Sequence, residues 1–147
     1  MIMQTNMLFY ERPNVGLLES VELFLDRLLP KTFQNRVDWR ALKLREFIDR
    51  DPVKIRGSLD PVCKELELSL SDRHARRIFK SSAGVGVKKY ARNKCLVRAA
   101  RQLQTTNLAV KAIAADAGYQ HPRDFARSFE QTFLLNPTAF RKMWGRI

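Results

Sequence analysis

Hydrophobic residues recur at intervals of three and four along most of the chain, which is the spacing of one face of an α-helix. Over 41–50, for example, Leu44 and Phe47 fall on the same face. This segment is expected to stop before Pro52, because proline disfavours helical geometry in the residue that precedes it. From Trp39 onward, no strand-like alternation bounded by hairpin turns interrupts this helical pattern. The pattern therefore predicts an all-α fold.

About seven helices are expected from residue 41 onward, and capping residues bound most of them. Ser58 is the expected N-cap of the second helix, while the third opens near Ser71 and ends at Gly84. Thr106 or Asn107 is expected to cap the fifth helix. The expected helical segments are about 41–50, 58–67, 71–84, 86–104, 109–118, 122–133 and 137–146.

The last helix has the clearest start signal in the chain. Asn136 is a good N-cap, and Pro137 suits the first helical position because proline has no N–H to leave unpaired there. Met143 and Trp144 are expected to pack against the core, and Trp39 is also interpreted as a packing residue. Ile78, in the segment 71–84, is likewise expected to face inward.

An internal repeat relates the two halves of this helical region. Residues 71–79 and 121–129 superimpose at an offset of 50, which pairs Arg73 with Arg123 and Phe79 with Phe129; Arg77 and Arg127 form a third pair in the same way. Each copy has two helices, a tight turn and an arginine-rich second helix. The repeat predicts two helix-turn-helix units, at about 58–84 and 109–133, joined by one long helix over 86–104.

The net charge of +12 lies entirely in the repeated region. Residues 1–40 contain five basic and five acidic side chains, whereas 41–147 contain 22 basic and 10 acidic side chains. Such an excess attracts a polyanion such as DNA and predicts salt-sensitive binding. Membranes and acidic proteins also attract basic domains, so the charge alone does not choose between them.

Basic side chains form a stripe on the second helix of each unit. The candidate contacts in the first unit lie at i, i+3, i+4 and i+7, and are Arg73, Arg76, Arg77 and Lys80. In the second unit Arg123 and Arg127 repeat the arrangement, with His121 near the helix start. Arginine suits this role because its planar fork can hydrogen-bond guanine O6 and N7 or clamp a phosphate. A solvated helix face is the alternative for either unit alone, and repetition at equivalent positions favours DNA contact.

The segment from Ala109 to Arg141 resembles the second helix-turn-helix and C-terminal helix of the AraC/XylS family of transcription regulators. The matching residues there are Ile113, Ala114, Gly118, Tyr119, Phe125, Arg127, Phe129, Asn136, Pro137, Phe140 and Arg141. Those of the first unit are Val62, Cys63, Ser71, Arg77, Phe79, Lys80, Gly84, Tyr90 and Leu103. The resemblance covers about 41–147. It implies promoter DNA as the partner, RNA polymerase as a second partner, and activation as the outcome.

The resemblance also implies which positions contact bases. Carried over by position, these are Arg73, Arg76, Arg77, Pro122, Arg123, Ala126 and Arg127. Pro122 and Ala126 can offer only apolar contact, for instance to a thymine methyl group. A connecting helix of 19 residues would be about 28 Å long, against about 34 Å between successive major grooves. One chain is therefore expected to address two adjacent grooves, with modest DNA bending as a further hypothesis.

Several positions depart from the family's usual residues. Glu67 and Leu134 stand where glycine is common, and Glu130 replaces a frequent lysine. Ala75 stands where a larger apolar residue is usual, and Cys95 where a basic residue is often found. The first turn, 67–71, is also about two residues longer than usual. These departures bear on the pose of the first recognition helix and on the phosphate contacts of the second.

Residues 1–40 are expected to form an extension with one amphipathic helix at about 16–29, and 41–147 are expected to form the DNA-binding domain. Three roles stay open for this helix: packing on the DNA-binding domain, pairing with another copy, or forming the end of an effector domain. The rival function is a truncated regulator that uses this helix to sequester a larger relative. The oligomeric state stays open, with a monomer on DNA as one alternative.

Other functional classes find no support in the sequence. No paired carboxylates, glycine-rich phosphate loop or nucleophile-base spacing predicts an enzyme, and no cofactor is expected. Cys63 is interpreted as a small core residue, and His74 and His121 lack a third ligand for a metal. The longest apolar runs are too short to span a membrane, and no secretory signal is evident. A cytoplasmic protein associated with the nucleoid is the expectation.

Overall fold

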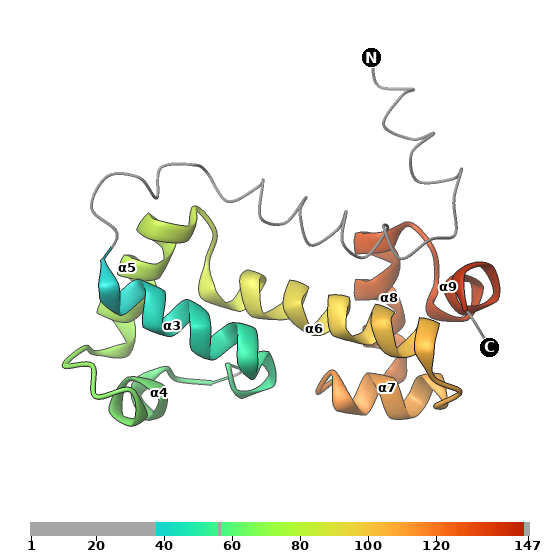
Figure 1. Ribbon diagram of the computed structural model, residues 1–147, viewed down its shortest axis with the longest axis horizontal. Helices are drawn as coiled ribbons and strands as arrows, with labels where there is room; N and C mark the ends of the chain where they lie inside the picture. The colour runs from blue at the N-terminus through green and yellow to red at the C-terminus, as the bar shows by residue number, and fades with distance from the viewer. Residues whose placement is uncertain (1–37, 56, 146–147) are drawn as a thin grey trace, which may run out of the picture. The chain divides into compact units, whose positions relative to one another are not determined.

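The computed structural model describes residues 38–55 and 57–145, and over these residues the protein is entirely helical (Figure 1). The elements are α3 (Trp39–Arg50), the 3-10 helix η2 (Pro52–Lys54), α4 (Asp60–Glu65), α5 (Asp72–Ala83), α6 (Val87–Thr105), α7 (Val110–Asp116), α8 (Pro122–Phe133) and α9 (Pro137–Trp144). The predicted all-α fold and its seven helices from residue 41 onward are confirmed. The helix expected at 16–29 lies outside the described residues.

Local capping chemistry explains why several helices begin and end where they were expected. The Ser71 hydroxyl accepts a hydrogen bond from the His74 N–H at the start of α5. Gly84, with φ of 74°, ends that helix in the left-handed conformation. At α9 the Asn136 side chain accepts from the Ala139 N–H at 2.8 Å. These caps satisfy backbone groups that have no partner inside the helix.

Three helix starts differ from the prediction. α3 begins at Trp39, two residues early, because the Asp38 carboxylate caps it. Leu59, not Ser58, occupies the N-cap position of α4, although the Ser58 hydroxyl still accepts from the Asp60 N–H. The N-cap of α7 is Ala109, and neither Thr106 nor Asn107 takes that role. The Thr106 hydroxyl instead donates to the Gln102 carbonyl at the end of α6.

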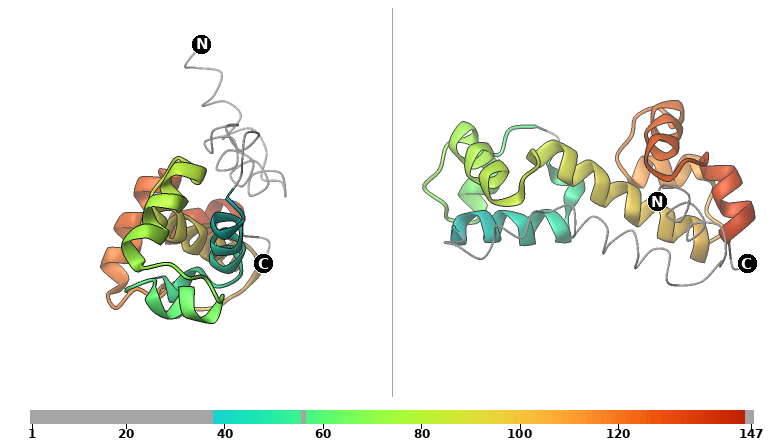
Figure 2. Two further views of the ribbon diagram at one scale, coloured as in Figure 1. Left: turned by 90° about the vertical axis from the view of Figure 1, so that its left-hand side faces the viewer. Right: turned by 90° about the horizontal axis from the view of Figure 1, so that it is seen from above.

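The described residues fall into two compact units, and the boundary divides α6 between Cys95 and Leu96. The N-terminal unit covers 38–95. Here α3 and α4 both pack on α5, beside the first turns of α6 (Figures 1 and 2). Its core includes Leu44, Phe47, Cys63 and Phe79, each at most 2% exposed. Cys63 is thus the small core residue that was expected, and burial raises the pKa of its thiol.

Tyr90 joins α6 to α3 within the N-terminal unit. Its hydroxyl donates to a carboxylate oxygen of Asp49 at 2.7 Å and accepts from Arg45 Nε at 3.2 Å. Lys94 lies 3.4 Å from the same carboxylate oxygen, and the Tyr90 ring packs edge-on against Phe79. Burial, followed by the Asp49 carboxylate, raises the pKa of the Tyr90 phenol. A polar contact and an aromatic contact therefore hold α6 in place together.

The C-terminal unit, 96–145, is built around aromatic side chains. α8 packs against both α7 and α9. The aromatic side chains in contact with one another are Tyr119, Phe125, Phe129, Phe133 and Phe140. Arg141 connects α9 to the last turns of α6 and to the segment after it, by donating to the backbone carbonyls of Leu103 and Leu108. These contacts fix the back of α8.

Three residues expected to pack inward are more exposed than predicted. Trp39 is 58% exposed, because the buried face of α3 lies on the other side and Lys43 covers only part of the ring. Met143 is 50% exposed, since Phe140 and Trp144 occupy the buried stripe of α9. Ile78 is half-buried at the edge of α5. None of the helices in the described ranges is long and apolar enough to cross a membrane.

Candidate nucleic-acid interface

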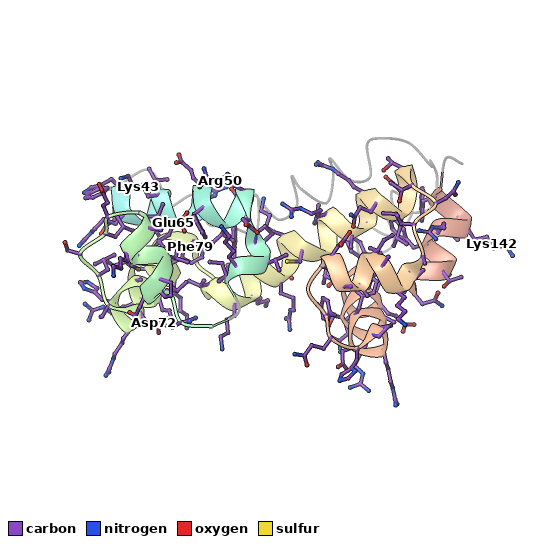
Figure 3. All side chains as sticks on the ribbon, turned by 90° about the horizontal axis from the view of Figure 1, so that it is seen from below. Lys43, Arg50, Glu65, Asp72, Phe79 and Lys142 are labelled. Atoms are coloured by element: carbon purple, nitrogen blue, oxygen red, sulfur yellow. The ribbon has the colours of Figure 1, made fainter. Side chains whose placement is uncertain are left out.

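One side of α5 is buried in the N-terminal unit, and the opposite side is cationic. Ala75 and Phe79 are at most 1% exposed, and Figure 3 shows Phe79 directed into the unit. At 100° per residue, Arg73, Arg77 and Lys80 fall opposite this face, and all three are exposed. None of the three forms an ion pair with another described residue. The front of α5 therefore presents three positive charges.

Two aspartates hold the turn between α4 and α5. Asp60 accepts a hydrogen bond from the Asp72 N–H at 2.8 Å, and Asp72 accepts one from the Leu59 N–H at 2.6 Å. Each carboxylate thus satisfies a free N–H at the start of the other helix. This reciprocal capping fixes how α5 leaves the turn, and Figure 3 shows Asp72 at the start of α5.

Arg76 differs from the rest of the predicted stripe because its guanidinium already has partners. Its Nε donates to both carboxylate oxygens of Asp72, at 3.0 and 2.9 Å, and its Nη2 donates to the Gly57 carbonyl at 2.9 Å. The Arg76 contact, followed by the bond from Leu59, lowers the pKa of Asp72. Arg76 is therefore part of the framework that holds α5. A base contact by this residue stays a prediction.

The C-terminal unit presents α8 in the same manner. Phe125 and Phe129 are 0% exposed, while Arg123 and Arg127 lie on the opposite face and are exposed. Their guanidinium groups have no ion-pair partner among the described side chains. At the helix start His121 and Pro122 are exposed, and farther along Ala126 is half-buried.

Two residues that replace family glycines adopt the conformation that glycine favours. Glu67 has φ of 54° in the turn between α4 and α5, and Leu134 has φ of 62° at the end of α8. The Leu134 N–H donates to the Glu130 carbonyl at 2.8 Å, as a helix-ending residue does. Ala75 and Cys95 are internal, at 0% and 5% exposed, whereas Glu130 is exposed. The substitutions therefore change residue type without removing the turns.

Sequence reasoning missed the residues that orient the recognition helices. Asp60 and Asp72 were not singled out, although an aspartate four residues before Arg76 is a recognisable ion-pair spacing. The contact of Arg141 with two carbonyls was also missed, and no local pattern signals it because the partners lie 33 and 38 residues away. No group of three or more potential metal ligands occurs in the part of the chain that the structure describes.

The comparison with protein families decides the assignment. A model described as a helix-turn-helix domain matches residues 66–143, more than half of the chain and including both recognition helices. The chain belongs to the AraC/XylS family. Members of this family are DNA-binding transcription regulators, and the resemblance identified in the sequence is confirmed.

Two curated bacterial relatives illustrate the match. The HTH-type transcriptional activator AarP of Providencia stuartii is 32% identical over 68 residues, which are 46% of this chain and 50% of the relative. The probable transcription factor PqrA of Proteus vulgaris is 33% identical over 69 residues, which are 47% of this chain and 57% of the relative. The chain thus spans about half the length of these AraC/XylS relatives.

Solved structures of the AraC/XylS type share the fold. The C-terminal domain of AraT, a response regulator from Geobacillus stearothermophilus, matches with a TM-score of 0.63 and 21% identity, covering 74% of this chain and 88% of that chain. The xylose-binding transcription activator xylR also has a TM-score of 0.63, with 18% identity, and covers 77% of this chain and 29% of that chain. At these identities the likeness concerns the fold.

Proposed function

We propose that this AraC/XylS protein is a sequence-specific transcription activator that inserts α5 and α8 into major grooves of promoter DNA. The observation that carries the proposal is the repeated pair of exposed arginines opposite a buried phenylalanine. The pair is Arg73 and Arg77 on α5, and Arg123 and Arg127 on α8. A helix with a packed back and two exposed guanidinium groups on its front fits the width of a major groove.

The exposed arginines are suited to base recognition because each can donate two parallel hydrogen bonds to guanine O6 and N7. Lys80 and His121 supply sequence-independent phosphate contacts in this proposal. Pro122 and Ala126 have no polar side-chain atoms, so their contribution is apolar contact at a thymine methyl group. The proposed contact surface of α8 therefore combines two base-reading arginines with a small apolar edge.

The length of α6 supports binding to adjacent grooves by one chain. Its 19 residues correspond to about 28 Å at 1.5 Å per residue, somewhat less than the roughly 34 Å between successive major grooves. Modest bending of the DNA would make up the difference. A phasing assay by gel electrophoresis tests the bend, and straight DNA in the complex would remove that part of the proposal.

Activation is proposed because relatives such as AarP are described as transcriptional activators. An activator at a promoter has RNA polymerase as its second partner, and its site of action is the nucleoid in the cytoplasm. Fusion of a bound promoter to a reporter tests this directly. Reporter output should rise when the protein is expressed, and a fall would assign repression instead.

Arg123→Ala tests the contact on α8. If Arg123 reads a base, the substitution should weaken binding to the cognate site by about 1–3 kcal/mol and relax preference at one base pair. Lys142→Ala, an exposed cation on α9, is the matched control and should leave the preference unchanged. Fluorescence anisotropy with cognate and single-base variant duplexes measures both effects. An equal loss on every duplex would assign Arg123 to phosphate contact.

A further inference from the structure

The two recognition helices carry different charges at equivalent positions. The offset of 50 pairs His74 of α5 with Asp124 of α8, and Lys80 with Glu130. Asp124 and Glu130 are both exposed. At 100° per residue they flank Arg127, one on each side of the arginine stripe. The acidic side chains therefore lie on the same face as the arginines proposed to meet DNA.

The formal charges of the two faces follow directly from these residues. Arg73, Arg77 and Lys80 give the front of α5 a charge of +3. On α8, the two arginines are cancelled by Asp124 and Glu130, so the front of that helix has no net charge. The difference is local to the recognition surfaces, because the whole chain is strongly basic.

Neither acidic side chain of α8 serves a visible structural contact. Within the described residues, Asp124 and Glu130 form no ion pair and no side-chain hydrogen bond. Asp72 of α5 is the opposite case, because its carboxylate binds Arg76 and the Leu59 N–H. Asp124 does lie in the first turn of α8, where the interaction of a negative charge with the helix dipole stabilises the helix modestly. Both α8 carboxylates are thus available to act on an approaching polyanion.

An exposed carboxylate facing DNA repels phosphate whatever the base sequence is. Attraction between cationic side chains and phosphates supplies nearly all the affinity for unrelated DNA. A face with no net charge gains little from this attraction, whereas a face of +3 gains much. Hydrogen bonds from arginine to guanine form only at a matching site, and there they can outweigh the repulsion.

We propose that the two units divide the work of DNA binding. On DNA that lacks a matching site, the N-terminal unit supplies the attraction to phosphate through Arg73, Arg77 and Lys80. Asp124 and Glu130 keep α8 from binding unrelated DNA, so the C-terminal unit engages only at a matching site. These two carboxylates are specificity-determining residues, because they reduce binding at all sites where the arginines of α8 find no base partner. The inference rests on the proposed function.

Paired arginine variants test the division. Arg73→Ala/Arg77→Ala should weaken binding to unrelated DNA and reduce the slope of log K against log salt by about two, since each lost phosphate contact removes about 0.9. Arg123→Ala/Arg127→Ala should lower affinity and slope on unrelated DNA much less than the α5 pair does, and should weaken binding to the cognate site at least tenfold. Equal losses on unrelated DNA for the two double variants would overturn the proposal.

Removing the carboxylates provides a second test, in which the affinity for unrelated DNA is expected to rise. Glu130→Gln and Asp124→Asn should each raise the affinity for unrelated DNA severalfold at low salt. Glu46→Gln is the matched control, since Glu46 is exposed on α3 and the change in net charge is the same. If Glu46→Gln raises that affinity as much as Glu130→Gln does, net charge alone explains the effect and the proposal is wrong.

These outcomes are distinguishable from failure of the proposed function. Wild-type protein with equal affinity for selected and scrambled DNA would refute sequence-specific regulation. Wild-type protein with clear preference, combined with equal effects of the two arginine pairs on unrelated DNA, would refute only the division between the units. Circular dichroism melts of each variant establish that it is folded at the assay temperature.

Discussion

Leu134 adopts a backbone conformation that its residue type disfavours. It occupies the place, 50 residues on, that Gly84 occupies in the first unit, and both have positive φ. The left-handed region costs a non-glycine residue about 1–2 kcal/mol, because its Cβ approaches the backbone. The Leu134 side chain is 74% exposed, so little burial offsets this cost. The backbone strain at Leu134 is therefore not compensated by packing of its side chain.

Leu134→Gly should stabilise the protein by about 0.5–1 kcal/mol. The substitution relieves the backbone strain, and the greater flexibility of glycine in the unfolded chain offsets part of that gain. Gly84→Ala should destabilise it by about 1 kcal/mol for the converse reason. Leu134→Ala is the control and should change little, since alanine has the same Cβ. Chemical denaturation measures all three, and a destabilising Leu134→Gly would contradict this account.

Asp72 is the residue through which pH should act on the N-terminal unit. Its pKa is lowered in the folded state, chiefly by Arg76 and then by the Leu59 N–H. A lowered folded pKa means that the contribution is complete above the unfolded value near 3.9. It is lost as pH falls from that value through the lower folded pKa.

Asp72→Asn should therefore cost about 1 kcal/mol at pH 7, because the charge-assisted bonds are weakened. The difference between wild type and variant should shrink as pH falls toward 3. Denaturation at a series of pH values measures it, and Arg76→Ala in the same series tests the partner. A difference that is constant with pH would exclude the ionised carboxylate as the cause.

At the scale of elements, α6 is attached to α3 through the Tyr90 hydroxyl. The ring of Tyr90 packs on Phe79 and is 5% exposed, while its hydroxyl contacts Asp49 and Arg45. The contributions of ring packing and of hydrogen bonding to stability can therefore be separated by removing the Tyr90 hydroxyl oxygen. The Asp49 carboxylate also lies near Lys94, so its charge remains partly balanced without the hydroxyl.

Tyr90→Phe should destabilise the protein by about 1.5–3 kcal/mol, the range expected for a hydrogen bond to a charged group. The effect should be smaller in an Asp49→Asn background, because the acceptor is then uncharged. A double-mutant cycle by thermal or chemical denaturation gives the coupling. Additive effects of the two substitutions would show that the hydroxyl and the carboxylate do not stabilise each other.

The elements that sequence predicted best are those with local start and stop signals. α5, α8 and α9 begin and end within a residue or two of expectation, because serine or asparagine caps, prolines and Gly84 act within one turn. The expected cap of α7 was wrong, since Thr106 bonds to the preceding helix instead of capping the next. Trp39 was wrong as a packing residue, because exposure depends on what the opposite face of α3 meets.

The arginine stripe of the candidate site was predicted from the sequence, but the contacts that hold one of its arginines were not. Periodicity places Arg73, Arg77, Arg123 and Arg127 opposite the buried phenylalanines, and the structure exposes all four. Periodicity cannot tell which arginine of a stripe is held by a neighbour, so the engagement of Arg76 with Asp72 and Gly57 emerged only in three dimensions.

At the scale of the whole molecule, the net positive charge and the internal repeat both indicate DNA binding. The excess of 12 positive charges lies in 41–147, where the two helix-turn-helix units occur. A general attraction to DNA follows from the charge, whereas preference for one sequence requires the guanidinium groups to meet base edges. Sequence preference, not affinity, is therefore the property that distinguishes a regulator from a merely basic protein.

Selection of bound duplexes from random DNA, followed by titration of the selected and scrambled sites, tests this claim most directly. The protein should enrich a single motif of two parts about one helical turn apart. At physiological salt it should bind that motif roughly a thousandfold or more tightly than the scrambled duplex. Failure to enrich any motif, or equal affinity for both duplexes, would contradict it.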